Sequence, residues 1–578
     1  MDNRQNIRPD DEQRKERGRI RKLEEGCPEG NELGRKIRDH WGVLLQRTEV
    51  LIIGGGITGA GIARDLACRG AEVVLVESSD FSNGATGRCH GMLHSGARYA
   101  VNDPRSAAEC AAENAILKRI AGFCIEDTGG LFVGLKNDDT DYADQFLSSC
   151  KKTGVAAKEI TIREALNREP MLSKEILSAF EVPDASVDPF LLTLGNIESA
   201  RKANGIALNY HCVKRFEIAG ESIDKVIVEN LRNKSIETYK PEIVVNASGA
   251  WANEIASLAN LSIRMTLDKG SMVVINGRLT NGLINRLRRP SNGDIVVPSC
   301  SSSIIGTTSV HVDSPFENKA TEEEVDFLIC EAARMVPDIL KSRAVRAYAG
   351  IRPLCGGDQS SGREISRNFQ VIDHSEQGIE NFISVIGGKL TTYRLMAEKV
   401  SDIVAAKLGI SGSCRTAIDP LSPTVERKND PTIAPSFSSL IGRKTQLLSN
   451  EIIRRCTGEL RGMEVVCSCE QVLRGELVYW SHHQDVKELS DLMRRTRAGM
   501  GYCQGGLCIF GLLSSMIDEP NRDPIELVAR FIKEREKGIE PVLFRGQLKE
   551  EFFKDHLFNG VYHLNAYSGE DHEEDFGS

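Results

Sequence analysis

A glycine-rich turn at residues 54–59, Gly-Gly-Gly-Ile-Thr-Gly, fits the pattern G-x-G-x-x-G that binds the pyrophosphate of a dinucleotide. The pattern carries weight only between a strand and a helix. Here an apolar run at 49–53 precedes the turn, a helical pattern at about 58–69 follows it, and a second apolar run occupies 72–76. This order predicts a βαβ unit with the turn at a helix N-terminus, where unpaired N–H groups attract phosphate.

Each residue of this unit has an expected role. Gly54 permits the tight turn, Gly56 lets the backbone approach a pyrophosphate, and Gly59 lets the helix pack closely on the strand. Glu77 ends the second strand, 21 residues after Gly56. Its carboxylate can accept hydrogen bonds from ribose hydroxyls and would repel a 2′-phosphate.

Three further turns favour FAD over NAD. A small-residue loop at 82–88 directly follows the second strand, and two later strands end on glycines, at 243–249 and at 382–388. The helix that begins after Gly388 can direct N–H groups toward the flavin edge where negative charge builds on reduction. The residues expected to contact FAD are Gly54, Gly56, Gly59, Glu77, Thr86, Gly87, Val213, Gly249, Gly387, Gly388, Lys389 and Leu390.

Four of the 16 cysteines are grouped. Cys467-x-Cys469 is followed, after 33 residues, by Cys503 and Cys508, with helix-like segments at 471–481 and 486–497 between the pairs. Four thiolates are what a [2Fe–2S] cluster needs. Zinc is an alternative, since both spacings suit a tetrahedral thiolate site, and disulfides are a third reading that a reducing compartment disfavours. We favour the cluster, and the segment resembles the bacterioferritin-associated ferredoxin type of domain.

Three motifs carry a wider resemblance. They are Leu-His-Ser-Gly-Ala-Arg-Tyr at 93–99, Ala-Gly-Ile-Arg-Pro-Leu at 349–354, and Gly-Gly-Lys-Leu-Thr-Thr-Tyr-Arg at 387–394. They resemble the FAD-dependent glycerol-3-phosphate dehydrogenases. From about residue 48 to 560 the chain is similar to the anaerobic type, in which the flavin-binding polypeptide ends in a small cysteine domain.

The resemblance implies oxidation of sn-glycerol 3-phosphate to dihydroxyacetone phosphate, with electrons passing through partner subunits to the membrane quinone pool. A phosphate dianion needs fixed cations. The family pattern places Arg98, Tyr99, Arg367 and Lys389 around the substrate. FMN bound together with a partner subunit is a further cofactor that the sequence leaves open.

Two residues are candidates for the chemical step. His94 is the candidate base for the hydroxyl proton, because a neutral imidazole titrates near the working pH and matches the histidine of the family's H-x-G-x-R-Y stretch. His90 is its rival. Arg352 is expected to stabilise the developing alkoxide. Met272 follows Lys-Gly-Ser where single-subunit relatives have a histidine, so a polar role is lost there.

Composition limits the partners and the location. Hydrophobic residues are 40% and charged residues 27% of 578, which is the balance of a globular protein, and the net charge of −9 argues against nucleic acid. We find no run of about 18–20 apolar residues and no signal peptide. The expected location is therefore the cytoplasm, attached to the inner face of the membrane through partners. Arg494, Arg495 and Arg497 are interpreted as a solvated helix face.

The predicted fold class is α/β: a Rossmann-like FAD-binding domain interleaved with an α+β substrate domain, followed by a small helical cysteine-ligated domain. The expected divisions are a charged, flexible leader at 1–48, the oxidoreductase at 49–410, a connector at 411–461, the cluster domain at 462–512, and a C-terminal helix with an acidic tail at 513–578. Two other functions stay open: flavin-dependent oxidation of a 2-hydroxy acid or an amine, and a non-catalytic redox relay.

Overall fold

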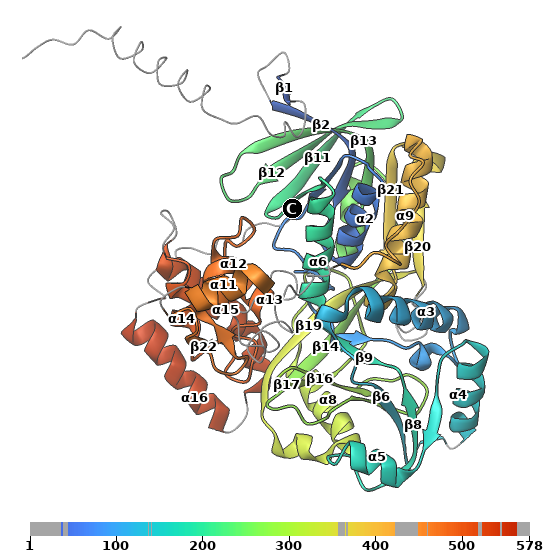
Figure 1. Cartoon of the computed structure of the whole chain (residues 1–578), viewed down its shortest axis with the longest axis vertical. Coiled ribbons are helices and arrows are strands. Elements are labelled where there is room, and N and C mark those ends of the chain that lie inside the picture. The colour runs from blue at the N-terminus through green and yellow to red at the C-terminus, as the bar shows by residue number, and fades with distance from the viewer. Residues whose placement is uncertain are drawn as a thin grey trace, which may run out of the picture.

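The computed structural model describes residues 36–38, 44–136, 138–139, 141–356, 365, 368–421, 449–458, 461–517, 523–543, 546–562 and 564. Two large sheets with their helices form the main body, and a group of short helices from the C-terminal part of the chain lies against one side of it (Figure 1). No helix of the described residues is both long and apolar enough to cross a membrane.

The first large sheet has a parallel centre, β10-β3-β2-β13, which β21 extends, as expected for the dinucleotide-binding unit. An antiparallel hairpin of β11 and β12 continues from β13, and β20 and β1 pair antiparallel with β21 and β2. The strands are β1 (Lys36–Arg38), β2 (Leu44–Ile53), β3 (Val73–Val76), β10 (Ile206–Leu208), β11 (His211–Ala219), β12 (Ser222–Asn230), β13 (Ile236–Asn246), β20 (Phe369–Asp373) and β21 (Phe382–Gly387).

Helices cover both faces of this sheet. The parallel strands are apolar on both faces because each face is buried, as the continuous run at 50–53 shows. The helices of one face, α2, α6 and α9, pack around Ile62, Ile197 and Val400, while α7 covers the other face. The elements are α2 (Ile57–Cys68), α6 (Pro189–Lys202), α7 (Ala252–Ser257), α9 (Tyr393–Leu408) and the short turns η3 (Gly249–Trp251), η5 (His374–Gln377) and η6 (Leu390–Thr392).

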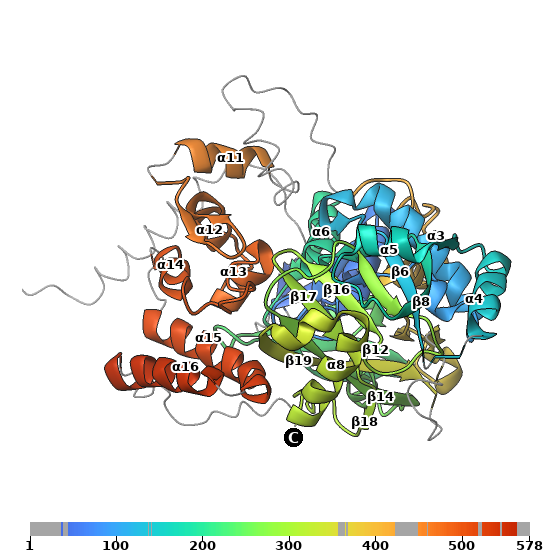
Figure 2. The same cartoon turned by 90° about the horizontal axis from the view of Figure 1, so that it is seen from below.

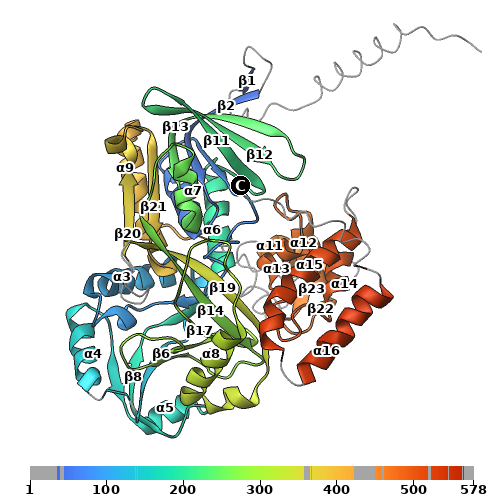
Figure 3. The same ribbon diagram turned by 180° about the vertical axis from the view of Figure 1, so that it is seen from behind.

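The second large sheet is mostly antiparallel, and its long strands β14 and β19 run alongside each other toward the first sheet (Figure 3). Its strands are β6 (Gly130–Leu135), β7 (Lys158–Ile160), β8 (Ile176–Val182), β14 (Met265–Ile275), β15 (Leu283–Arg286), β16 (Ile295–Ser299), β17 (Ser302–Gly306), β18 (Val310–Val312) and β19 (Ala344–Cys355). The helices with it are α3 (Pro104–Ile120), α4 (Asp141–Lys152), α5 (Ile162–Arg168), α8 (Glu322–Met335), η1 (Ala97–Tyr99), η2 (Gly122–Cys124) and η4 (Pro337–Lys341). A small sheet of β4 (Met92–Leu93), β9 (Ala185–Val187) and β5 (Ile125–Glu126) completes it.

The C-terminal helices form a compact group with its own core around Leu477, Trp480, Leu492 and Phe531 (Figure 2). The elements are α11 (Ser449–Gly458), β22 (Val465–Cys467), β23 (Val472–Leu473), α12 (Arg474–Ser481), α13 (Leu489–Thr496), α14 (Ile509–Ser514), α15 (Pro524–Ile539), η7 (Glu540–Val542), α16 (Gly546–Asp555) and the π-helical turn η8 (His556–Val561). Phe531 belongs to α15, so the helix placed after the cluster domain by the sequence packs into the same core.

Three expected divisions differ from the structure. Residues 36–38 and 44–48 are paired strands, which contradicts a flexible leader extending to residue 48. The start of the expected connector packs on the first domain, because Leu421 is buried there and Arg64 donates to the Asp419 carbonyl. Its end forms α11, which packs on α12. Residues 422–448 and the acidic tail at 569–578 lie outside the described residues.

Candidate functional site

A cavity of about 1240 Å³ lies where the ends of the parallel strands meet the second sheet. This position, beyond the carboxyl ends of parallel strands, is where open α/β sheets bind ligands. Most of the residues predicted to contact FAD or substrate line it: Gly54, Gly56, Glu77, Thr86, His94, Arg98, Tyr99, Val213, Gly249, Arg352, Gly387, Gly388, Lys389 and Leu390. Arg367 lies outside the described residues.

The glycine turn has the close contacts that its sequence predicts. Gly54 has a φ of +108°, and a Cβ there would lie 2.6 Å from the Ala247 carbonyl oxygen. A Cβ on Gly59 would collide with the Gly54 carbonyl, so this glycine serves packing and does not line the cavity. A Cβ on Gly56 would come close only to the Thr86 hydroxyl, at 3.2 Å, which leaves the face of Gly56 open to the cavity. A dinucleotide pyrophosphate fits this cradle.

Glu77 is positioned at the end of β3 by two backbone donors. Its carboxylate accepts from the N–H of Gly55 at 2.7 Å and from the N–H of Ser79 at 2.9 Å. The carboxylate therefore sits against the glycine turn and lines the cavity, where ribose hydroxyls could reach it. The same loop closes over the helix start, since Ile57 N–H donates to Thr86 Oγ1 at 3.1 Å. Gly87 does not line the cavity, and a Cβ there would collide with the Ser82 carbonyl.

His94, Tyr99 and Lys389 converge on one part of the cavity. The ring centroids of His94 and Tyr99 are 5.3 Å apart, and the Lys389 Nζ lies 5.0 Å from the Tyr99 ring centre. Lys389 also donates to the Ser106 hydroxyl at 3.1 Å. His90 is close, with its ring centroid 5.8 Å from that of His94. The histidines are thus placed together, and the geometry leaves the choice of base as a prediction.

Arg352 is held over the cavity by residues of the neighbouring strands. Its Nη1 donates to Asp268 Oδ2 at 2.5 Å, and its Nη2 donates to Thr307 Oγ1 at 2.7 Å. Asp268 is buried, and the Ser309 hydroxyl donates to its other oxygen. The sequence analysis missed Asp268 and Thr307 as partners, although Asp268 directly precedes the Lys-Gly-Ser stretch at 269–271.

Arg98 and Met272 are fixed by the second sheet. Arg98 is 8% exposed and donates to Asp294 Oδ2 at 3.0 Å and to the Ser291 carbonyl at 3.2 Å. The cavity thus holds Arg98 in an arranged pair and not as a surface charge. Met272 is 1% exposed and pairs with Gly306 across the strands, so it is a packing residue.

The four grouped cysteines come together at one end of the C-terminal helices. Side-chain hydrogen bonds join Cys467 to Cys508, Cys508 to Cys503, and Cys503 to Cys469. The contact with Cys508 lowers the pKa of Cys503 to about 5 and that of Cys467 to about 6, and it raises the pKa of Cys508. Thiolate character is what a metal centre requires of cysteine.

The arginines of α13 lie in a buried interface, so the prediction of a solvated helix face was wrong. Arg495 donates to both oxygens of Asp80, at 2.8 and 2.9 Å, and Arg494 donates to Asp80 at 3.1 Å. Arg497 pairs with Asp188 at 3.0 Å and Glu470 at 2.9 Å. The sequence could not show this, because Asp80 and Asp188 come from the first domains of the chain.

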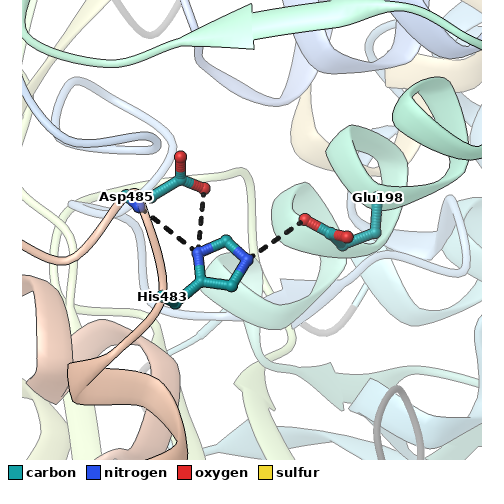
Figure 4. A group of neighbouring side chains, drawn as sticks. All are labelled: Glu198, His483 and Asp485. Atoms are coloured by element: carbon teal, nitrogen blue, oxygen red, sulfur yellow. Dashed lines mark hydrogen bonds and ion pairs between the residues drawn. The ribbon is translucent and has the colours of Figure 1, made fainter. Parts of the chain in front are cut away.

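A second contact joins α6 to the loop between α12 and α13 (Figure 4). The His483 ring lies between Glu198 and Asp485, 3.9 and 3.5 Å from their oxygens. Arg201 already donates to both carboxylates at 2.8 Å, so the negative charge that a metal ion would need is neutralised. We therefore interpret this group as part of the interface between the two domains.

The comparisons with known proteins agree with this geometry. The family model described as FAD dependent oxidoreductase (DAO) matches residues 49–394. The A subunit of anaerobic glycerol-3-phosphate dehydrogenase from Escherichia coli (strain K12) is 42% identical over 533 residues, which cover 89% of this chain and 97% of that protein. The A1 subunit of the Haloferax volcanii enzyme is 36% identical over 540 residues, covering 89% and 90%.

Among solved structures, a glycerol-3-phosphate dehydrogenase from Bacillus halodurans complexed with FAD matches with a TM-score of 0.65 at 21% identity. The match covers 86% of this chain and 96% of that chain, and at this identity it supports the fold alone. The sheet topology, the glycine turn and the matched model define an FAD-dependent oxidoreductase of the DAO class. Within that class, the chain belongs to the family formed by the A subunits of anaerobic glycerol-3-phosphate dehydrogenases, which confirms the resemblance seen in the sequence.

Proposed function

We propose that the chain oxidises sn-glycerol 3-phosphate to dihydroxyacetone phosphate and passes the electrons on through its cysteine domain. The observation that carries the proposal is the convergence of Arg98, Arg352 and Lys389 on the cavity that also contains the dinucleotide turn. Fixed cations of this kind suit a phosphate dianion. The 42% identity to a glycerol-3-phosphate dehydrogenase polypeptide supports the same substrate.

The chain's own residues supply binding and proton transfer. Arg352, oriented by Asp268 and Thr307, stabilises negative charge on the substrate oxygen, and Arg98 and Lys389 attract the phosphate. His94 takes the hydroxyl proton at one of its ring nitrogens, which its place beside Tyr99 and Lys389 allows. FAD, bound against Gly54, Gly56 and Glu77, supplies the hydride acceptor.

The cysteine domain would hold a [2Fe–2S] cluster through Cys467, Cys469, Cys503 and Cys508. In one tetrahedral zinc site, four sulfurs at about 2.3 Å from the metal lie about 3.8 Å apart. In the described part of the chain, the one trio of His, Cys, Asp or Glu ligand atoms mutually within 4.8 Å is Glu198, His483 and Asp485. The sulfurs are instead linked in sequence, which supports a centre with more than one metal ion.

Partner subunits would receive the electrons and attach the enzyme to the inner face of the membrane, where quinone is reduced. The letter in the name of the E. coli relative supports an assembly of several chains. The loop between Cys503 and Cys508 is accessible to such a partner, because Leu507 is 78% exposed and Tyr502 is 47% exposed. FMN held together with a partner remains part of this proposal.

A spectrum of the purified protein, prepared without oxygen, tests the proposal. We expect flavin bands and iron–sulfur bands, with the flavin bands bleached by sn-glycerol 3-phosphate. Bleaching by 2-hydroxyglutarate or an amine in place of glycerol 3-phosphate would contradict the substrate assignment. Flavin that no substrate reduces would favour a redox relay without catalysis.

A further inference from the structure

Arg535 of α15 is a buried arginine that contacts the cysteine centre from outside the expected cluster domain. It is 6% exposed, and its guanidinium lies 5.1 Å from the Phe531 ring centre. Its Nη2 donates to the Gly499 carbonyl at 2.8 Å and also contacts the Met493 sulfur, and its Nη1 donates to Gln504 Oε1 at 3.1 Å.

These bonds brace the segment 499–504, which holds the cysteines in place. The Gly499 N–H donates to the Cys467 sulfur, and the Gln504 amide donates back to the Gly501 carbonyl at 2.9 Å. Gly501 packs directly on Cys469, since a Cβ there would collide with the Cys469 side chain. One guanidinium thus fixes a segment that touches two of the four cysteines and ends beside a third, Cys503.

The charge of Arg535 is not offset by a carboxylate. Within the described residues it forms no ion pair, although buried arginines elsewhere at this junction pair with Asp80, Asp188 or Glu470. Burial lowers the pKa of Arg535, and the nearby Arg346 guanidinium lowers it further. A buried, unpaired cation is destabilising by several kcal/mol, so a negative partner is needed. The charges that act favourably on it come from Glu534 and from Cys508.

We propose that Arg535 is a positioning residue of the cysteine centre, which braces the 499–504 segment and supplies the positive charge that balances the thiolates. This inference rests on the proposed metal centre. Reduction of an iron–sulfur cluster adds negative charge, and a nearby fixed cation stabilises that form, so Arg535 raises the reduction potential of the cluster. Removing the charge then lowers the potential, whereas a lysine retains part of the effect.

The test compares Arg535→Gln, Arg535→Lys and the control Arg530→Gln, which changes an exposed arginine on the same helix. Iron content, flavin content and the midpoint potential of the cluster, followed by electron paramagnetic resonance, are measured in each. We expect a lower potential in Arg535→Gln, an intermediate one in Arg535→Lys, and wild-type values in Arg530→Gln. A wild-type potential in loaded Arg535→Gln would overturn the proposal.

A variant that cannot keep its metal is tested by the rate of metal release to a chelator. Faster release from Arg535→Gln and Arg535→Lys than from Arg530→Gln supports the bracing role, and equal rates overturn it. Zinc without iron in the wild-type protein would refute the proposed cluster and leave Arg535 to be judged by zinc release alone. The two proposals can therefore fail separately.

Discussion

Asp80 and Arg495 form a buried, two-pronged ion pair between the FAD-binding sheet and the cysteine domain. The two Nη–Oδ distances are 2.8 and 2.9 Å, and both side chains are essentially inaccessible. Burial opposes ionisation of Asp80, but the guanidinium groups of Arg495 and Arg494 hold its pKa below the ordinary value. Asp80 follows Glu77 closely in the chain, so the pair ties the cysteine domain to the segment that lines the FAD cavity.

Breaking this pair should destabilise the junction. Arg495→Met leaves the Asp80 carboxylate buried without its main partner, and we expect the free energy of unfolding to fall by about 3–5 kcal/mol. Urea unfolding, together with the fraction of FAD retained, measures the effect. Arg415→Met removes an exposed ion pair with Asp419 and should leave both quantities unchanged. An equally small effect in Arg495→Met would mean that the domains are held by other contacts.

The stability of the junction should depend on pH through Asp491, which accepts from the Tyr210 hydroxyl at 2.8 Å. Burial raises the pKa of Asp491 to about 7 from an ordinary value of 3.8, and the Asp80 carboxylate adds to the rise. The folded protein then binds this proton more tightly than the unfolded chain does. Its contribution to stability is therefore complete below about pH 4 and is lost as the pH rises to about 7.

Unfolding experiments between pH 4 and pH 8 test this prediction. We expect Asp491→Asn to reduce the decline in stability between about pH 4 and 7, because the amide does not ionise. Asp326→Asn, at an exposed position on α8, serves as the control and should keep the wild-type profile. An Asp491→Asn profile parallel to the wild type would assign the decline to another group.

Glu77→Ala should weaken FAD binding by about 1.5–3 kcal/mol, the scale of losing a hydrogen bond to a charged acceptor. The substitution also removes the acceptor of the Gly55 and Ser79 N–H groups. Retention of flavin through a desalting column measures the effect. Glu72→Ala changes an exposed carboxylate next to the start of the same strand and should retain flavin as the wild type does. Full retention in Glu77→Ala would show that Glu77 is not the ribose ligand.

Arg352→Ala should lower kcat/KM for glycerol 3-phosphate by at least about 10²-fold, because one preorganised charge partner is lost. Flavin content should not change, since no predicted FAD contact is removed. Steady-state assays with an artificial dye provide the measurement. Arg278→Ala, which removes an arginine paired with Glu126 away from the cavity, is the matched control. A value of kcat/KM within threefold of the wild type would rule out the role of Arg352.

Cys503→Ser should separate the two halves of the reaction. A hydroxyl is a poor ligand for an iron–sulfur cluster, so the cluster should be lost or become labile. Stopped-flow bleaching of the flavin by substrate should survive, while transfer to the natural acceptor should fall sharply. Cys330→Ser replaces an exposed cysteine of α8 and should preserve both steps. Full electron transfer by an iron-depleted Cys503→Ser protein would show that the path avoids the cysteines.

The sequence by itself determined the local units. The strand–turn–helix around Gly54 to Gly59 was predicted because glycine spacing and apolar runs are short-range signals. The helix of α2 begins at Ile57 and ends at Cys68, close to its expected 58–69. The α/β class and the FAD-dependent family followed from such motifs, and the family model and the relatives confirm both.

The limits of the domains were less accessible to sequence. Charge content indicated a leader through residue 48, yet β2 begins at Leu44 because its polar first residues pair with β1 and β13 at the sheet edge. The serine- and proline-rich composition of 411–461 likewise concealed α11, whose Ile452 and Ile453 are buried against α12. A strand end or a short helix of this kind is stabilised by contacts with distant elements, which composition does not record.

Only the tertiary structure decided which charges meet. Arg495 and Asp80, Arg352 and Asp268, and Arg535 and the segment at 499–504 are brought together by the packing of separate domains and strands. A charged side chain has the same sequence signal whether it faces water or a buried partner, so Arg494, Arg495 and Arg497 looked like a surface. Burial makes each pair strong and selective, and burial is a property of the assembled fold.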